Sequence, residues 1–161
     1  IRNCDWSSDV CSSDLISSSV NGSLTSYTVN QLNQYTQVGN KTYQYDADGN
    51  LTRIDGSGQV WSFSYNSENR LVSATTPQGS FLYDYDALGN RSAVVANGQR
   101  TEFQVDPFGW GDVIGEYNAT GLATANYLHG IGLVSQVNAS GEAFYYDSDA
   151  IGSTEIGRAH V

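Results

Sequence analysis

Aromatic and polar residues alternate along this chain in a pattern that returns every twenty residues. Each copy reads aromatic, any residue, aromatic or apolar, then Asp or Asn, and the copies begin at Tyr43, Phe63, Tyr83 and Phe103. Around the second copy, Trp61, Phe63 and Tyr65 alternate with Ser62 and Ser64. Successive side chains of a strand point to opposite faces, so this alternation predicts strands with one aromatic face. A fixed period of this length indicates a repeat protein, whose units must stack on their neighbours.

Tight turns are predicted between these strands. Residues 46–50 and 86–90 combine an Asp, which can bond its own nearby backbone, with a Gly, which accepts a positive φ. The residue three positions after the Asp or Asn of each copy is Gly49, Asn69, Gly89 or Gly109. Further turns are predicted at 55–58, 77–80 and 97–99. Each period therefore predicts about two short strands and two turns, which amounts to one hairpin.

The fold class predicted from these elements is all-β. No stretch keeps apolar residues at the spacing of a helix face, and abundant Tyr, Val and Thr with frequent Gly favour strands. Strands are expected at 42–45, 51–54, 60–65, 70–74, 80–85, 92–96 and 100–105. The period changes at Pro107. Beyond it, two longer hairpins are expected, with first strands at 113–117 and 133–137 and turns at 118–121 and 138–141; residues 127–132, with His129 in a loop, are expected between them.

The two ends of the chain do not continue the repeat. Residues 9–15 and 155–161 can be written in codons that are reverse complements of each other, and both look like strands of a short-read sequencing adapter. We therefore interpret residues 1–15 and 155–161 as adapter-like artefacts and leave them out of the fold prediction. What remains is a set of repeats over 16–106 and a second region over 107–154, which is expected to be truncated.

Charge and composition exclude several function classes. The chain has 7 Lys and Arg against 17 Asp and Glu, a net charge of −10. Six of these charged residues lie in the end segments, and 16–154 stays strongly acidic without them. The clustered basic face that binds nucleic acid or anionic membranes is therefore not predicted. No apolar run approaches the ~20 residues of a membrane span. Both cysteines, Cys4 and Cys11, fall in the first end segment, so disulfides and cysteine metal sites are unsupported in 16–154.

The repeat resembles the Rhs/YD-repeat family, which includes bacterial Rhs proteins, the cocoon-forming Tc-toxin subunits and the YD shell of teneurins. The resemblance rests on residues 43–52, Tyr-Gln-Tyr-Asp-Ala-Asp-Gly-Asn-Leu-Thr, and is supported by residues 85–91. Residues 127–130, 144–147 and 150–154 look like the approach to the RHS-associated core of that family. Asn66 and Asn69 replace Asp and Gly in one copy, and Asn can serve the same turn chemistry.

This resemblance implies tandem YD-repeat β-hairpins that form part of a large, spiralling β-sheet shell. In bacterial members the shell encloses a C-terminal polymorphic toxin, for export or contact-dependent competition. The chain is accordingly expected to be a non-catalytic structural segment, secreted or at the bacterial cell surface. Its partners would be the rest of its own shell and the C-terminal toxin. The alternative is a surface YD-repeat protein that binds carbohydrates or receptors; an enzyme would need a site from a domain beyond residue 154.

No residue is predicted to be catalytic, cofactor-binding or metal-binding. Asp46, Asp48 and Asn50 have the spacing of the first ligands in a calcium loop. Such a loop also needs a bidentate Glu at its twelfth position, where this chain has Ser57. Turn chemistry is therefore the better interpretation of the three residues.

Other candidate residues also favour structural interpretations. Carboxylates two residues apart occur at Asp84 and Asp86 and at Asp147 and Asp149, but nothing in the pattern builds a cleft between them. His129 has no second histidine or cysteine in 16–154 to complete a metal site or a triad. Trp61 and Trp110 could stack on sugars, although strand alternation favours packed aromatic rows. Glycosylation sequons start at Asn21, Asn40, Asn50, Asn90, Asn118 and Asn138, mostly in predicted turns.

Overall fold

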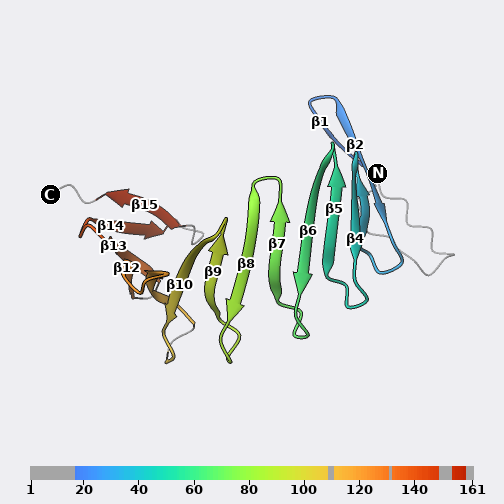
Figure 1. Ribbon diagram of the computed structural model, residues 1–161. Helices are drawn as coiled ribbons and strands as arrows, with labels where there is room; N and C mark the ends of the chain where they lie inside the picture. Colours follow the sequence, from blue (N-terminus) through green and yellow to red (C-terminus); the bar gives the residue numbers. More distant parts are fainter. Residues whose placement is uncertain (1–16, 109–110, 131, 149–153, 159–161) are drawn as a thin grey trace.

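The computed structural model describes residues 17–108, 111–130, 132–148 and 154–158. These residues form one antiparallel sheet of fifteen strands in which each strand pairs with the next along the chain (Figure 1). The strands are β1 (Ser17–Val20), β2 (Ser23–Val29), β3 (Tyr35–Val38), β4 (Lys41–Tyr45), β5 (Leu51–Gly56), β6 (Gln59–Tyr65), β7 (Leu71–Thr76), β8 (Gly79–Tyr85), β9 (Arg91–Ala96), β10 (Gln99–Val105), β11 (Val113–Asn118), β12 (Ala123–His129), β13 (Leu133–Asn138), β14 (Ala143–Ser148) and β15 (Thr154–Arg158).

The sheet twists strongly along its length. In Figure 1, β4 to β10 stand side by side, whereas β12 to β15 lie almost across them. The first and last strands therefore lie at opposite ends of the sheet, because the strand order follows the chain order without a crossover. Twist of one hand accumulates in any sheet of L-amino acids, so a long meander of this kind curves rather than lying flat.

The pairing register sorts the side chains onto two faces. Directly opposed residues lie on the same face of a sheet, and the first aromatic of each copy opposes an equivalent position in the following strand. These pairs are Tyr43 with Ile54, Phe63 with Ala74, Tyr83 with Val94, and Phe103 with Glu116. We call this side the aromatic face. The residues that alternate with these along each strand lie on the opposite side, which we call the polar face. There Ser64 opposes Ser73, and Asp84 opposes Ala93.

Burial in this single-layer sheet is confined to small side chains. Ala74, Ala93, Ala125 and Ser135 are buried among the described residues, and no large side chain is fully enclosed. The aromatic side chains of Trp61, Phe63 and Phe81 are half-buried. Cross-strand contacts, each contributing about 0.2–1 kcal/mol, therefore stabilise the sheet in place of a packed second layer.

The predicted all-β class and the predicted strands are confirmed. Each predicted strand in 42–105 is observed, and most are one or two residues longer than expected. The hairpins that turn near 118–121 and 138–141 are also present, as β11–β12 and β13–β14. The prediction that His129 lies in a loop is wrong. It is the last residue of β12, because Leu128 and His129 still pair with β13.

Some sequence predictions fall outside the described residues. These are the first end segment, the glycine and tryptophan at 109–110, Asp149, and most of the core-like stretch 150–154. In the second end segment, residues 155–158 belong to β15 and pair with β14.

Candidate functional site

Asp and Asn side chains build a repeated turn at the strand ends. At Asp86, one carboxylate oxygen accepts hydrogen bonds from the backbone N–H of Leu88 at 2.9 Å and of Asn90 at 2.8 Å. The same pair of bonds recurs at Asn30, Asp46, Asn66, Asn118 and Asn138. The fourth residue of each turn has a positive φ: Asn33, Gly49, Asn69, Gly89, Gly121 and Gly141. The predicted turn chemistry is therefore confirmed, including the exchange of Gly for Asn at Asn69.

The turns of neighbouring hairpins touch one another along one set of strand ends. The Gln34 amide donates to the carbonyl oxygen of Gly49 at 3.2 Å, and the Asn50 amide donates to Asn69 Oδ1 at 2.8 Å. The Arg70 guanidinium occupies the space that a Cβ on Gly89 would need. In each case the fifth residue of one turn meets the fourth residue of the next. We call this series, from Gln34 to Gly89, the turn ladder.

The turn motif moves to the opposite strand ends after β11. In the antiparallel order, the turns at 30–34, 46–50, 66–70 and 86–90 lie at one set of strand ends, and the two-residue turns at 57–58 and 97–98 lie at the other. The Asn118 and Asn138 turns follow β11 and β13, and so lie at this second set of strand ends. At the change of period predicted at Pro107, the turns built on an Asp or Asn side chain (Asx turns) therefore move from one set of strand ends to the other.

Basic side chains cover aromatic rings. Lys41 Nζ lies 5.2 Å from the Trp61 ring centroid, and the Arg91 guanidinium carbon lies 4.8 Å from that of Tyr83. Arg70 lies 5.7 Å from the Tyr85 ring. Such contacts stabilise by about 0.5–1 kcal/mol at exposed sites. The ring faces that a bound sugar would need are thus partly occupied by the chain's own cations.

The second tyrosine of the motif ties adjacent strands together. The Tyr45 hydroxyl donates to the carbonyl oxygen of Tyr35 at 2.9 Å, and the Tyr85 hydroxyl donates to that of Leu71 at 2.8 Å. Burial, with a smaller contribution from Tyr43, raises the pKa of Tyr45, so this phenol keeps the proton that it donates. These tyrosines thus stabilise the pairing of adjacent strands within the sheet.

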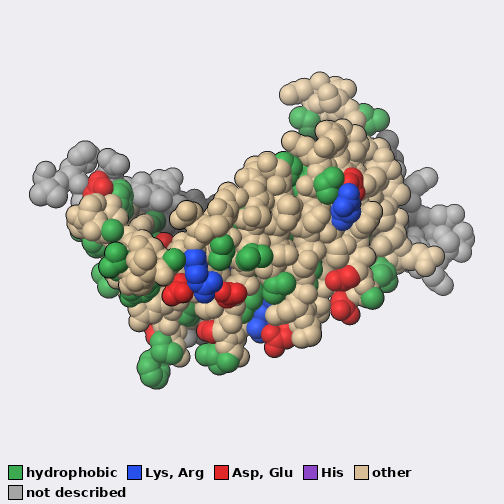
Figure 2. All heavy atoms as spheres, in the orientation of Figure 1, with side chains coloured by type: hydrophobic (Ala, Val, Ile, Leu, Met, Phe, Trp, Pro, Cys, Tyr) green, Lys and Arg blue, Asp and Glu red, His purple; other side chains and the backbone are tan. Residues whose placement is uncertain are grey.

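The polar face carries exposed ion pairs. Arg100 binds Asp84 at 2.8 Å and Glu102 at 2.9 Å, and both acids oppose Ala93, which explains why Ala93 is buried. Figure 2 shows a face on which basic side chains lie directly against acidic ones. Exposed pairs of this kind contribute at most about 1 kcal/mol. On the polar face these two acids therefore share a single arginine, and they are engaged with it rather than with each other.

The structure separates the carboxylates that the sequence placed two residues apart. Asp84 faces Arg100, whereas Asp86 is turned into its own backbone. Asp46 likewise accepts three bonds from Asp48 and Asn50, which occupy the oxygens that a calcium ion would need. Among the described residues, no group of three or more His, Cys, Asp or Glu side chains is placed to hold a metal ion, and no helix is long and apolar enough to cross a membrane.

The Asx turns predict a specific pH dependence. The side-chain hydrogen bond from Asn90 lowers the pKa of Asp86, helped by backbone N–H groups and opposed by desolvation. A group with a lowered folded-state pKa stabilises the fold above its unfolded pKa of about 3.9, and this contribution disappears as pH falls through the folded pKa. Asp86→Asn should keep the turn, as Asn66 does in the equivalent position, but cannot titrate.

Urea denaturation of both chains, followed by tryptophan fluorescence, measures this dependence. The advantage of the wild type over Asp86→Asn should shrink between neutral pH and about pH 3. A stability difference that stays constant with pH would contradict the assigned hydrogen bonds.

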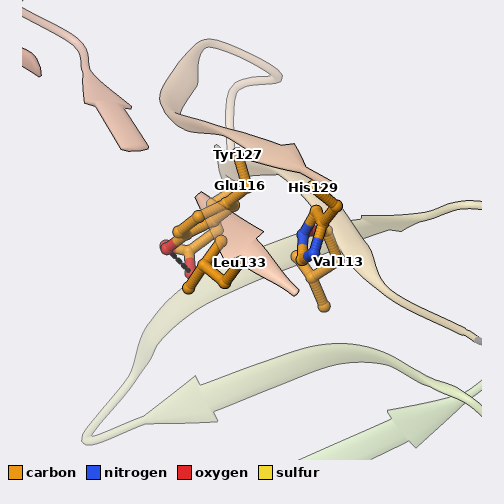
Figure 3. Close-up of a pocket in the computed structure, with 5 residues that line it drawn as sticks. All are labelled: Val113, Glu116, Tyr127, His129 and Leu133. Carbon is orange, nitrogen blue, oxygen red and sulfur yellow. Dashed lines mark hydrogen bonds between the residues drawn. The ribbon is translucent and has the colours of Figure 1, made fainter. Parts of the chain in front are cut away.

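Sequence reasoning missed one cavity, which lies on the aromatic face. It measures about 200 Å³ and is lined by Val113, Glu116, Tyr127, His129 and Leu133 (Figure 3). Its residues come from β11, β12 and β13, and only the register brings them together. His129, taken as an isolated histidine in the sequence, lies 2.9 Å from the Val113 carbonyl oxygen through Nε2 and 3.8 Å from Asp112 through Nδ1.

Comparison with known proteins gives one family match. Residues 45–80, from the end of β4 to the start of β8, match the family described as RHS Repeat. Over these residues the chain is therefore similar to an RHS repeat, as its sequence indicated. A crystal structure of TcdB2-TccC3-TEV is similar with a TM-score of 0.29 and 10% sequence identity, over 84% of this chain and 11% of that chain. This chain thus spans only about a tenth of that chain's length. No curated protein matches it.

Proposed function

We propose that this chain, which is similar to an RHS repeat over residues 45–80, is a non-catalytic wall segment of an Rhs/YD-repeat shell that encloses a C-terminal toxin. The observation that carries the proposal is the uninterrupted strand order, in which each hairpin uses both of its edges to pair with its neighbours. Such a sheet can lengthen indefinitely in one direction, and its paired edges are protected from aggregation. These are the properties that a wall requires.

The turn ladder and the two faces support the same proposal. The ladder joins successive hairpins at their tips, which resists shear between repeats. The aromatic face is half-buried, whereas the polar face carries ion pairs. A wall has two unlike sides, one toward the contents and one toward the surroundings, and an alternating strand supplies both.

The partners and place of action follow from the same proposal. The partners are the rest of the shell and the toxin, and the protein acts outside a bacterial cell or on its surface. Sequencing the gene beyond codon 154 tests this directly. The expected result is further repeats, then a core region and a domain that inhibits growth when expressed alone. A lectin-like module or a catalytic module in that place would overturn the proposal.

Binding to glycans or receptors is the weaker candidate. A sugar stacks on an open aromatic ring, but Lys41 covers Trp61 and Arg91 covers Tyr83. A glycan array probed with the chain is expected to show no saturable binding. Binding that is lost in Trp61→Ala would favour the carbohydrate function instead.

A further inference from the structure

Glu116 breaks the repeat at a defined position. The residues that oppose the first aromatic of the first three copies are Ile54, Ala74 and Val94, all apolar. In the fourth copy the equivalent residue, opposite Phe103, is Glu116. The aromatic face otherwise carries aromatic and aliphatic side chains, with cations such as Lys41 and Arg91 over the rings, so an acid is unusual there and costs desolvation. Packing alone therefore does not account for this glutamate.

The break coincides with the cavity on the aromatic face. Figure 3 shows Glu116 and Tyr127 meeting on one side of it, with His129 over Val113 on the other and Leu133 nearby. The Tyr127 hydroxyl donates to Glu116 Oε1 at 2.8 Å. Burial, followed by the hydrogen bond to Glu116 and its charge, strongly raises the pKa of Tyr127. The phenol therefore keeps its proton and acts as a donor to the carboxylate.

The carboxylate keeps capacity for a second partner. A carboxylate has two oxygens and about four lone-pair sites, and Tyr127 fills one of them at Oε1. Elsewhere in the described sheet, acids such as Asp55, Glu68 and Asp84 pair with an arginine. Within the same part of the chain, no Lys or Arg forms an ion pair with Glu116. A cation supplied from outside would complete this site.

The size and lining of the cavity restrict the cation. Drug-sized ligands occupy about 300–1,000 Å³, so a cavity of about 200 Å³ suits a single side chain. Arginine binds carboxylates best through two parallel hydrogen bonds, one to each oxygen, and the bond from Tyr127 leaves only Oε2 with both of its lone pairs open. A lysine needs only one oxygen for its compact ammonium group, and its alkyl stem packs on apolar walls such as those of Val113 and Leu133.

We propose that this cavity binds a lysine side chain from another polypeptide segment, with the ammonium group on Glu116 and the stem against Val113 and Leu133. The charge of the whole chain, −10, favours the approach of such a basic segment. The inference does not rest on the proposed wall function, because it uses only the geometry of β11 to β13. Failure of the one leaves the other in place.

The test is an NMR titration of the full chain with three probes: the N-acetyl methylamides of lysine, arginine and norleucine. Lysine should bind at least about tenfold more tightly than norleucine, which has the same stem without the charge, and more tightly than arginine. The aromatic signals of Tyr127 and His129 should shift on binding. Equal affinity for lysine and norleucine, or no shift of these signals, would overturn the proposal without any variant.

Variants then assign the effect to Glu116. Glu116→Gln keeps the size and can still accept from Tyr127, and it should erase the preference for lysine. Tyr127→Phe keeps the carboxylate and should retain the preference. Glu102→Gln removes an acid from the polar face, where Glu102 pairs with Arg100, and should also retain it. A preference that falls equally in Glu102→Gln and Glu116→Gln would show general charge attraction, and would overturn the site.

Discussion

Replacing Ala74 by aspartate is expected to lower the free energy of unfolding by about 3–5 kcal/mol, since it buries a charge without a partner. Ala74 is only 5% exposed. It lies on the aromatic face between Phe63 and Phe81, which oppose it from the two adjacent strands. Domains of this size are stable by about 5–15 kcal/mol, so this substitution should remove between about a fifth and all of the stability. Urea denaturation followed by tryptophan fluorescence measures the loss.

Ser73→Asp is the matched control for this substitution. Ser73 is the preceding residue of β7, and it opposes Ser64 and Leu82 on the polar face. The same new carboxylate can reach water there, so the free energy of unfolding should change by no more than about 0.5 kcal/mol. Equal losses at the two positions would contradict the assignment of faces, and with it the register of the central strands.

Gly89→Ala is expected to lower the free energy of unfolding by roughly 2–3 kcal/mol. Gly89 has a φ of 89°, a conformation that costs a residue with a Cβ about 1–3 kcal/mol. The new methyl group would also enter the space of the Arg70 guanidinium. Arg70 would then lose its place over the Tyr85 ring and beside Glu68. Both the turn and its contact with the neighbouring hairpin should weaken.

Gly98→Ala separates these two causes. Gly98 has a similar φ of 84°, but no atom lies within 4 Å of the position that its Cβ would take. Only the conformational cost should remain, which makes Gly98→Ala the milder substitution. Adding Arg70→Ala should remove the excess cost of Gly89→Ala, because the side chain that the methyl displaces is then absent. If Gly89→Ala lowers the free energy of unfolding equally with and without Arg70, then the Arg70 contact of the turn ladder does not couple its two hairpins.

The sequence predicted the repeat because its signals are local. Alternation at Trp61, Phe63 and Tyr65 fixes a strand and its aromatic face, and the Asp86 turn needs only residues four positions apart. Even the exchange of Gly for Asn could be anticipated, since Asn tolerates the φ of 58° observed at Asn69. Local chemistry of this kind does not depend on the rest of the fold.

The parts that could not be predicted depend on register across strands. The cavity joins Glu116, Tyr127 and Leu133 from three strands, and bulges in two of the pairings shift the register by one residue. Such a shift changes which residues oppose one another, and the amino-acid pattern does not reveal it. The place of His129 at the end of β12 was missed for the same reason. The move of the Asx turns to the opposite strand ends follows instead from the order of the strands.

Protease protection of the C-terminal domain that the proposal places after this wall segment tests the central claim most directly. The full-length protein should be compared with that domain expressed alone, under one dose of a nonspecific protease. If this chain is part of an enclosing wall, the C-terminal domain should remain intact in the longer protein and be degraded when alone. Ala74→Asp in the longer protein should abolish the protection. Degradation of that domain at the same rate in both proteins would contradict the account.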